Sequence, residues 1–305
     1  MIRDYTWDFE EYFYMNNLYS YSLDYEKEPV LYVNPQESFE ANVLNAFNGS
    51  FSNEEELTET IKKGFHHPAF GPVYVNGATK HSSLKISIKD IIPQNVAYQC
   101  LSKSTGFCKF DTSKGRRLKI LKYDGDIIYD GFRMPASPSL GMIGLACKNK
   151  TRTGRVDYSG GNIDISEIKK GTTIILPSSY DGGLLYLGDL HLMQNNGEIS
   201  GIAAETSGSV IISVEITKKQ FNFPVIQNKS GITILGFGNS IKEAGSSACN
   251  NAVEYFAMNL DIDKVDAYMF LGIWGELLVG HATGKVVSCG IKVKSEYLKK
   301  RGIKV

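Results

Sequence analysis

The sequence predicts a mostly β protein with a few helices, an α+β arrangement, and two observations favour this class. Short stretches of alternating apolar and polar residues recur along the chain, separated by Gly, Asn and Asp, as half-buried strands require. Segments with helical spacing are few and lie mainly near the C-terminus. The chain has 305 residues, which is enough to bury a substantial core in one large unit or in two lobes.

A short helix is the first element with clear sequence signals. Ser52 and Glu55 form a capping-box pattern ahead of the apolar residues Leu57 and Ile61. Gly64 follows at the position where a helix commonly ends. We therefore expect a helix between Ser52 and Gly64.

Strands are predicted in several stretches after this helix. Residues 83–88 alternate apolar and polar side chains, as expected for a strand with one buried face. Similar segments recur at 172–176 and 210–216. A last strand is expected at 285–293, where the alternation returns and where the chain would rejoin a sheet.

Two helices are predicted in the C-terminal part of the chain. Residues 248–260 carry aliphatic and aromatic side chains at helical spacing, and Asp263 is suited to cap a second helix through 267–271. The Gly- and charge-rich stretch 148–155 is the best candidate for a boundary. We place it at residue 150, between an N-terminal β-rich lobe (1–150) and a C-terminal lobe (151–305).

Composition excludes some partners. Lys plus Arg number 33 and Asp plus Glu number 33, so no overall positive field exists to attract a phosphate backbone, and nucleic acid is not expected as a partner. No apolar run approaches the ~20 residues of a membrane-spanning helix, and the first residues lack the apolar core of a signal peptide. We therefore expect no membrane association and a cytoplasmic location.

The segment 188–201 concentrates side chains suited to hydrolytic chemistry. Asp189 and His191 are two residues apart, so on a strand they share one face and could bind one metal ion. Asn162 and Asp164 repeat this spacing, and Asp164 could add an oxygen ligand or orient His191. Glycines beside both pairs would let a substrate approach the backbone closely.

Glu198 is the candidate proton-transferring residue. Asn196 and Gly197 form a strong two-residue hairpin signal, which would pair Asn195 with Glu198. In that register Glu198 would lie roughly 13 Å from His191, at ~3.3 Å per residue, too far to share its metal ion. We therefore expect Glu198 to act as general base or acid from a loop that folds over.

A structural interpretation of these residues stands beside the functional one. The segment 188–201 could be a hairpin with an exposed tip, a capping Asp and a hydrogen-bonded, half-buried His. His67, next to Pro68, could be a further metal ligand or a solvated loop residue. His281 is expected in a turn after a short strand, with no part in the site.

Several blocks resemble one known family. Residues 188–201 are similar to the Gly-Asp-x-His-Ala-x-Gln-Gly-Asp-Gly-Glu signature of the acetamidase/formamidase family. Residues 67–78, 139–146 and 160–164 resemble its His-Pro-x-x-Gly-Pro-Val-Tyr-Val-Glu-Gly-Ala, Gly-x-Ile-Gly-Val-Ala and Gly-Gly-Asn-Met-Asp segments, in the same order. The resemblance extends from about residue 30 to the C-terminus.

This resemblance implies a metal-dependent amidohydrolase that cleaves a small linear amide to ammonia and a carboxylate. It implies a sandwich-like β lobe, a mixed C-terminal lobe and a homo-oligomer, a dimer or trimer. Zinc suits the histidine ligands, while oxygen-rich ligation would also admit calcium or magnesium. The expected metal ligands are Asp189, His191, Asp164 and His67; the expected catalytic residues are Glu198 and Asp189; the expected substrate-binding residues are Asn162, Gln194 and Gly161.

The sequence also departs from the family pattern. Asn195 and Asn196 stand where the signature has Gly-Asp, and Asn45 stands where relatives tend to carry Asp. These amides motivate two alternatives: a non-catalytic relative that binds a metal or a small polar ligand, and an enzyme for a larger amide.

Overall fold

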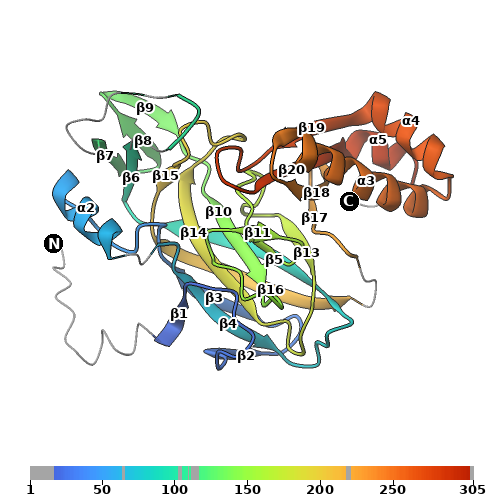
Figure 1. Ribbon diagram of the computed structural model, residues 1–305, viewed down its shortest axis with the longest axis horizontal. Coiled ribbons are helices and arrows are strands. Elements are labelled where there is room, and N and C mark those ends of the chain that lie inside the picture. The colour runs from blue at the N-terminus through green and yellow to red at the C-terminus, as the bar shows by residue number, and fades with distance from the viewer. Residues whose placement is uncertain are drawn as a thin grey trace.

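The computed structural model describes residues 17–63, 66–101, 105–108, 110, 117–217 and 221–302. Strands dominate this part of the chain and form two sheets, with a helical layer at one end (Figure 1). The predicted mostly β class is confirmed. Gly64, the expected end of the first helix, lies outside the described residues.

Twelve of the described strands form the first sheet. Its main path runs in the order β11 (Val156–Asp157), β12 (Gly160–Asn162), β10 (Ser139–Leu145), β14 (Leu185–Met193), β15 (Ala204–Glu205), β6 (Val96–Leu101), β7 (Arg117–Tyr123), β8 (Asp126–Tyr129) and β9 (Phe132–Pro135). Off this path, β4 (Ala69–Val75) pairs with β14, β1 (Tyr19–Ser20) and β2 (Leu31–Val33). The β2–β4 pair is parallel.

The second sheet contains eight of the described strands. Its order is β19 (Gly275–Val279), β20 (Val287–Lys294), β18 (Gly231–Gly238), β17 (Val225–Asn228), β13 (Thr173–Pro177), β5 (Ser83–Pro93), β16 (Gly208–Thr217) and β3 (Ser38–Val43). The four predicted strands correspond to β5, β13, β16 and β20. Both sheets contain strands from before and after residue 150. The lobe boundary at this residue stays a prediction.

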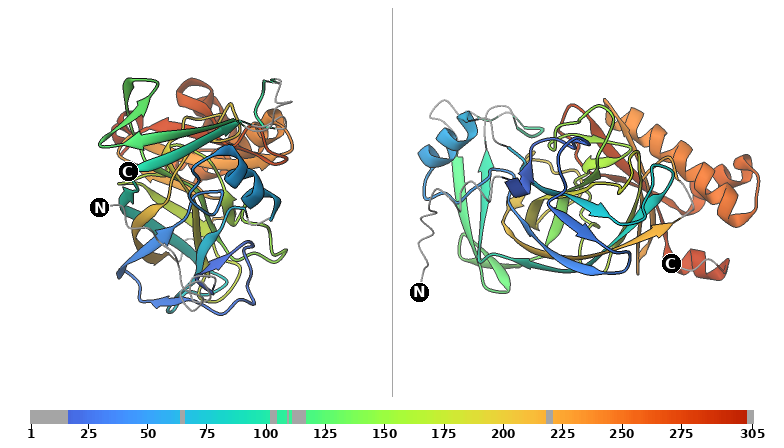
Figure 2. Two further views of the ribbon diagram at one scale, coloured as in Figure 1. Left: turned by 90° about the vertical axis from the view of Figure 1, so that its left-hand side faces the viewer. Right: turned by 90° about the horizontal axis from the view of Figure 1, so that it is seen from below.

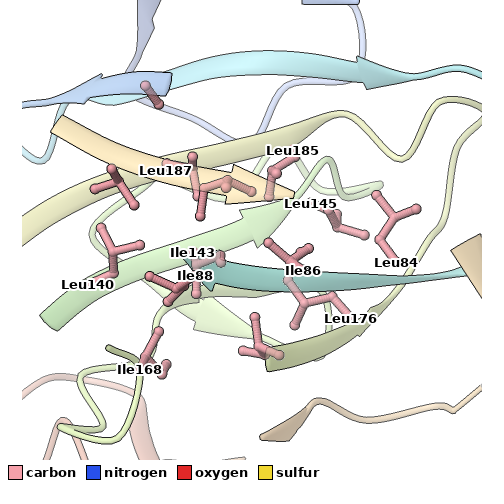
Figure 3. Packing of buried hydrophobic residues seen from close by; sticks show 14 of the residues in the cluster. Leu84, Ile86, Ile88, Leu140, Ile143, Leu145, Ile168, Leu176, Leu185 and Leu187 are labelled. Carbon is pink, nitrogen blue, oxygen red and sulfur yellow. The ribbon is translucent and has the colours of Figure 1, made fainter. Parts of the chain in front are cut away.

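The main core lies between the two sheets, as Figure 3 shows for its central residues. Leu140 of β10 and Leu187 of β14 meet Ile86 and Ile88 of β5, and these side chains are almost fully buried. Facing apolar sides on two sheets are the condition for a sandwich, and the sandwich-like lobe expected from the family resemblance is confirmed. Truncating one such residue to Ala typically costs about 2–5 kcal/mol.

Helix α2 (Glu54–Lys62) is present where predicted, but its cap is Asn53. The Oδ1 atom of Asn53 accepts hydrogen bonds from the backbone N–H groups of Glu55 and Glu56, each at 3.0 Å. The backbone N–H of Ser52 donates to Oε2 of Glu56 at 2.8 Å. The capping pattern is therefore real but shifted by one residue.

The C-terminal helices cover one face of the second sheet at its β17–β20 end (Figures 1 and 2). They are α3 (Ile241–Leu260), α4 (Lys264–Trp274) and α5 (Ser295–Lys300). As predicted, Asp263 caps α4 and accepts a hydrogen bond from the N–H of Asp266 at 2.8 Å. Among the described residues, no helix combines the length and apolar character needed to cross a membrane.

Candidate metal centre

Strand β14 changes its neighbour midway along its length. Gly188 pairs with Ala69 of β4, whereas His191 pairs with Glu205 of β15. Asp189 lies at this change and has a φ of 56°, a left-handed conformation that non-glycine residues adopt infrequently. The switch brings residues before β4 and residues of β15 to the same place on β14.

Gly141 of β10 lies across from Asp189 in the antiparallel register of β10 and β14. A Cβ atom at Gly141 would come within 2.5 Å of both Oδ1 of Asp164 and Cε1 of His191, and within 2.9 Å of Oδ2 of Asp189. No real side chain tolerates such contacts, so glycine is required for the three side chains to converge here. Gly141 falls within one of the blocks that resemble the family.

Asp189 and His191 form the centre of the first group, as their spacing predicted. Oδ1 of Asp189 lies 3.2 Å from Nε2 of His191, and both side chains are buried. Nε2 of His191 is also 3.5 Å from Oε1 of Glu205. Nδ1 of His67 is 3.5 Å from Oδ2 of Asp189, so His67 reaches the group from the segment before β4.

A second group lies beside the first and centres on His281. Nδ1 of His281 is 3.0 Å from both Oδ2 of Asp164 and Oε2 of Glu198. Oδ2 of Asp164 also accepts a hydrogen bond from Nδ2 of Asn162 at 2.5 Å. The β19–β20 loop carries His281, and its backbone N–H donates to Oγ of Ser288 at 2.8 Å. The second sheet thus contributes a side chain to a site built mainly on the first.

The turn expected at Asn196 and Gly197 forms, because the N–H of Glu198 donates to the carbonyl oxygen of Asn195 at 3.2 Å. The hairpin expected around this turn is wrong. Beyond a bulge, β14 pairs Met193 with Ala204 of β15, which leaves the intervening residues as a wide loop. Gly197 forms a parallel bridge with His281, and this contact folds the loop back over the site. Glu198 consequently lies near His191 and not roughly 13 Å away. This agrees with the expectation that Glu198 reaches the site from a loop that folds over.

The first group favours the charged forms of Asp189 and His191 and the neutral form of Glu205. Burial disfavours the carboxylate of Asp189, but the charges of His191 and His67 outweigh burial and hold the pKa of Asp189 well below its usual range. Burial likewise disfavours the His191 cation, yet Glu205 and Asp189 raise the pKa of His191 well above its usual value. Burial and the charge of Asp189 raise the pKa of Glu205 well above normal.

The second group contains Glu198 and His281, the two side chains best placed to exchange a proton. Burial and the nearby charge of Asp164 raise the pKa of Glu198, although the hydrogen bond from His281 opposes them. Burial disfavours the His281 cation, but hydrogen bonds to Asp164 and Glu198 outweigh it and raise the pKa of His281 to about 10.

Many polar atoms of the site lack a hydrogen-bond partner within the described part of the chain. They are Nδ1 of His67, Oδ1 of Asn162, Oδ1 of Asp164, Oδ1 of Asp189 and both ring nitrogens of His191. Buried polar atoms are normally satisfied, so this set calls for a bound species. Two overlapping sets could hold a metal ion: Asp189, His191 and Glu205, and Asp164, His191 and Glu198, each with candidate ligand atoms within 4.8 Å of one another.

A cavity of about 220 Å³ opens onto these groups. Of the predicted site residues, His67, Asn162, Asp189 and Glu198 line it. Asp164 and His191 do not line the cavity but belong to the two candidate metal-binding sets. Gly161 and Gln194 are both buried, and neither lines the cavity. Their substrate-binding roles stay predictions.

Sequence reasoning missed Glu205 and His281. His281 was expected in a turn, because nothing in the sequence shows that its loop returns to β12 and the 188–201 segment. Glu205 carries no spacing signal, since its place opposite His191 follows from the β14–β15 pairing. Both line the cavity.

Two of the amides that depart from the family pattern have structural partners. Oδ1 of Asn45 accepts hydrogen bonds from the N–H groups of Phe47 at 3.0 Å and Gly49 at 3.4 Å, and so shapes a loop beside the cavity. Oδ1 of Asn196 accepts from the backbone N–H and the hydroxyl of Ser166, at 3.1 and 3.0 Å. An amide serves both positions without any part in proton transfer.

The fold and the cavity define a β-rich protein with a candidate metal centre of carboxylates and histidines. Residues 141–288 match the model of the Acetamidase/Formamidase family. The solved acetamidase of Bacillus halodurans has a TM-score of 0.87 and 26% identity, over 93% of this chain and 98% of that one. A predicted acetamidase/formamidase from Thermoanaerobacter tengcongensis has a TM-score of 0.88 and 23% identity, over 95% and 97%. The predicted resemblance to the acetamidase/formamidase family is thus confirmed by sequence and by fold.

Curated relatives match over shorter segments. The formamidase of Methylophilus methylotrophus is 35% identical over 119 residues, which cover 32% of this chain and 29% of the relative. A relative from Schizosaccharomyces pombe is 41% identical over 70 residues, 23% of this chain and 17% of the relative. The aligned segments therefore span less than a third of either curated relative.

Proposed function

We propose that this protein is a metal-dependent amidase that hydrolyses a small linear amide to ammonia and a carboxylate. The observation that carries the proposal is the cluster of four buried carboxylates, the buried His191 and the partly exposed His67 and His281 at the cavity, with several atoms that lack a hydrogen-bond partner among the described residues. The activities named for the relatives favour amide hydrolysis as the reaction.

The residues present fit a divalent metal. Asp189 and His191 are the core ligands in this proposal, with Glu205 as the third and His67 beside them. Imidazole nitrogen and carboxylate oxygen are both zinc ligands, and the unpaired atoms of Asp189 and His191 are the ones a metal would satisfy. Zinc is the proposed ion, with calcium or magnesium as the alternatives that oxygen-rich ligation admits.

A divalent metal bound there would polarise the amide carbonyl and acidify a water molecule. Glu198 acts as the general base and then as the general acid that protonates the leaving nitrogen. Its raised pKa suits this role, because an efficient proton carrier has a pKa nearer the working pH than an ordinary carboxylate. Asp164 assists as a charge that keeps the pKa of Glu198 high.

His281 and Asn162 position this machinery. The N–H of His281 at Nδ1 is shared between Oε2 of Glu198 and Oδ2 of Asp164, which fixes both carboxylates. Asn162 donates to Asp164 through Nδ2 and presents its Oδ1 atom, which has no partner among the described residues, as an acceptor for the substrate amide N–H.

A non-catalytic relative that binds a metal or a small polar ligand is the alternative function. The departures at Asn45 and Asn196 motivated it, and their structural partners now weaken that motive. Ammonia release from formamide, acetamide and propionamide, with metal restored and then chelated, separates the two. The amidase proposal expects chelator-sensitive release; bound metal with no release from any amide would support the alternative.

We also propose that the protein acts as a homo-oligomer, a dimer or trimer, in the cytoplasm. Analytical ultracentrifugation tests the first statement, and cell fractionation tests the second.

A further inference from the structure

The cavity at the candidate centre has two unlike walls. One wall carries the carboxylate, imidazole and amide groups described above. The other is apolar, and its residues are Ala46, Phe47, Ile61 and Ile202. The first wall suits an amide group and the second suits a hydrocarbon chain attached to it.

The apolar wall is continuous with a packed cluster, so its shape is fixed. Ile61, from the last turn of α2, and Ile202, from the loop after Glu198, both pack on the cluster that contains Phe47. Asn45 holds the backbone of Phe47, and the Phe47 ring packs edge-on against Phe51 with centroids 6.2 Å apart. Helix α2 therefore serves to close the site with apolar side chains.

The cavity is large for the smallest amides. A volume of about 220 Å³ holds roughly seven to eleven non-hydrogen atoms, at about 20–30 Å³ for each. Formamide and acetamide, with about three and four such atoms, would leave water against the apolar wall. Longer acyl chains would displace that water, which favours their binding.

We infer that the preferred substrate is an aliphatic amide with about three to five acyl carbons, whose chain lies against Phe47, Ile61 and Ile202. This inference rests on the proposed amide hydrolysis for its substrate class, while the pocket itself is tested by binding alone. Each methylene buried on this wall should improve binding by about fourfold.

The first arm of the test is ligand-observed NMR titration of the metal-loaded protein with formamide, acetamide, propionamide, butyramide and valeramide. We expect the dissociation constant to fall by about fourfold per methylene up to butyramide or valeramide. Ile202→Trp should fill the wall and remove this trend. The control Ile92→Trp, at an exposed position of β5 outside the cavity, should retain it.

Equal affinity along the amide series, or an unchanged trend in Ile202→Trp, would overturn the proposal that the apolar wall binds the acyl chain. The second arm measures kcat/KM for ammonia release along the same series, and we expect it to rise in parallel with affinity. A rising affinity series without any ammonia would support the pocket and contradict the proposed amidase, so the two failures are distinguishable.

Discussion

Oε2 of Glu198 lies 3.0 Å from Nδ1 of His281, although 83 residues separate the two side chains in the chain. The contact joins a folded-over loop of the first sheet to the β19–β20 loop of the second. It fixes the carboxylate that we propose as the proton carrier.

Glu198→Gln should lower kcat by about 10²- to 10⁴-fold, the usual contribution of a general acid or base. The amide keeps the shape and still accepts the hydrogen bond from His281, but it cannot take a proton. Metal content, measured by elemental analysis, should stay at the wild-type level. Glu276→Gln, at an exposed position of β19, is the matched control and should behave as wild type. Wild-type kcat in Glu198→Gln would remove Glu198 from the mechanism.

Asp189→Ala should lose bound metal, because its carboxylate is the shared neighbour of His191 and His67 in the proposed ligand set. We expect metal affinity to fall by more than about 10- to 100-fold, the loss typical of residues that merely support ligands. Equilibrium dialysis against buffered zinc measures it. Wild-type metal affinity in this variant would contradict the ligand assignment, whatever happens to the rate.

Gly141→Ala should disable the site while leaving most of the fold intact. The added methyl group would displace Asp164 and His191 from positions only 2.5 Å from it, and a displacement of about 1 Å can cost roughly 10²-fold in rate. Gly245→Ala, where the new methyl group meets Leu277 at an ordinary 3.6 Å, is the control. Comparable kcat/KM values for these two variants would show that Gly141 has no role in convergence.

The free energy of unfolding of metal-stripped protein should decrease as the pH rises from about 6.5 to about 10. Burial disfavours the His281 cation, but Asp164 and Glu198 raise its pKa to about 10 from 6.5. The folded state then holds a proton that the unfolded state has released, so this stabilisation is complete below pH 6.5 and lost through pH 10. Urea unfolding at several pH values measures the slope, and His281→Gln should make it shallower. An identical slope in the variant would contradict the raised pKa of His281 as a source of this pH dependence.

The sequence located four of the described strands and the helices α2, α3 and α4, because the signals of these elements are local. It did not predict α5, and α3 begins at Ile241, seven residues before the predicted segment. Alternation located β5, β13, β16 and β20, and Asp263 marked the start of α4. The capping box was misplaced by one residue, since Asn53 competes with Ser52 for the same backbone donors.

The sequence indicated only some of the residues that meet at the candidate site, because others depend on contacts between distant parts of the chain. Asp189 and His191 converge because residues two apart on a strand share a face, which spacing alone reveals. Glu205 and His281 depend on which strands pair and where a distant loop returns, and no local pattern encodes that pairing. The Asn196–Gly197 signal correctly located a turn, but no hairpin continues from it, because Met193 pairs with Ala204 of β15.

The most direct test of the central claim is ammonia release by the purified protein across the amide series, first with zinc restored and then with zinc removed by a chelator. We predict release that chelation abolishes and added zinc recovers, in the wild type but not in Asp189→Ala. Release that continues undiminished after complete removal of metal would contradict the proposed metal-dependent mechanism.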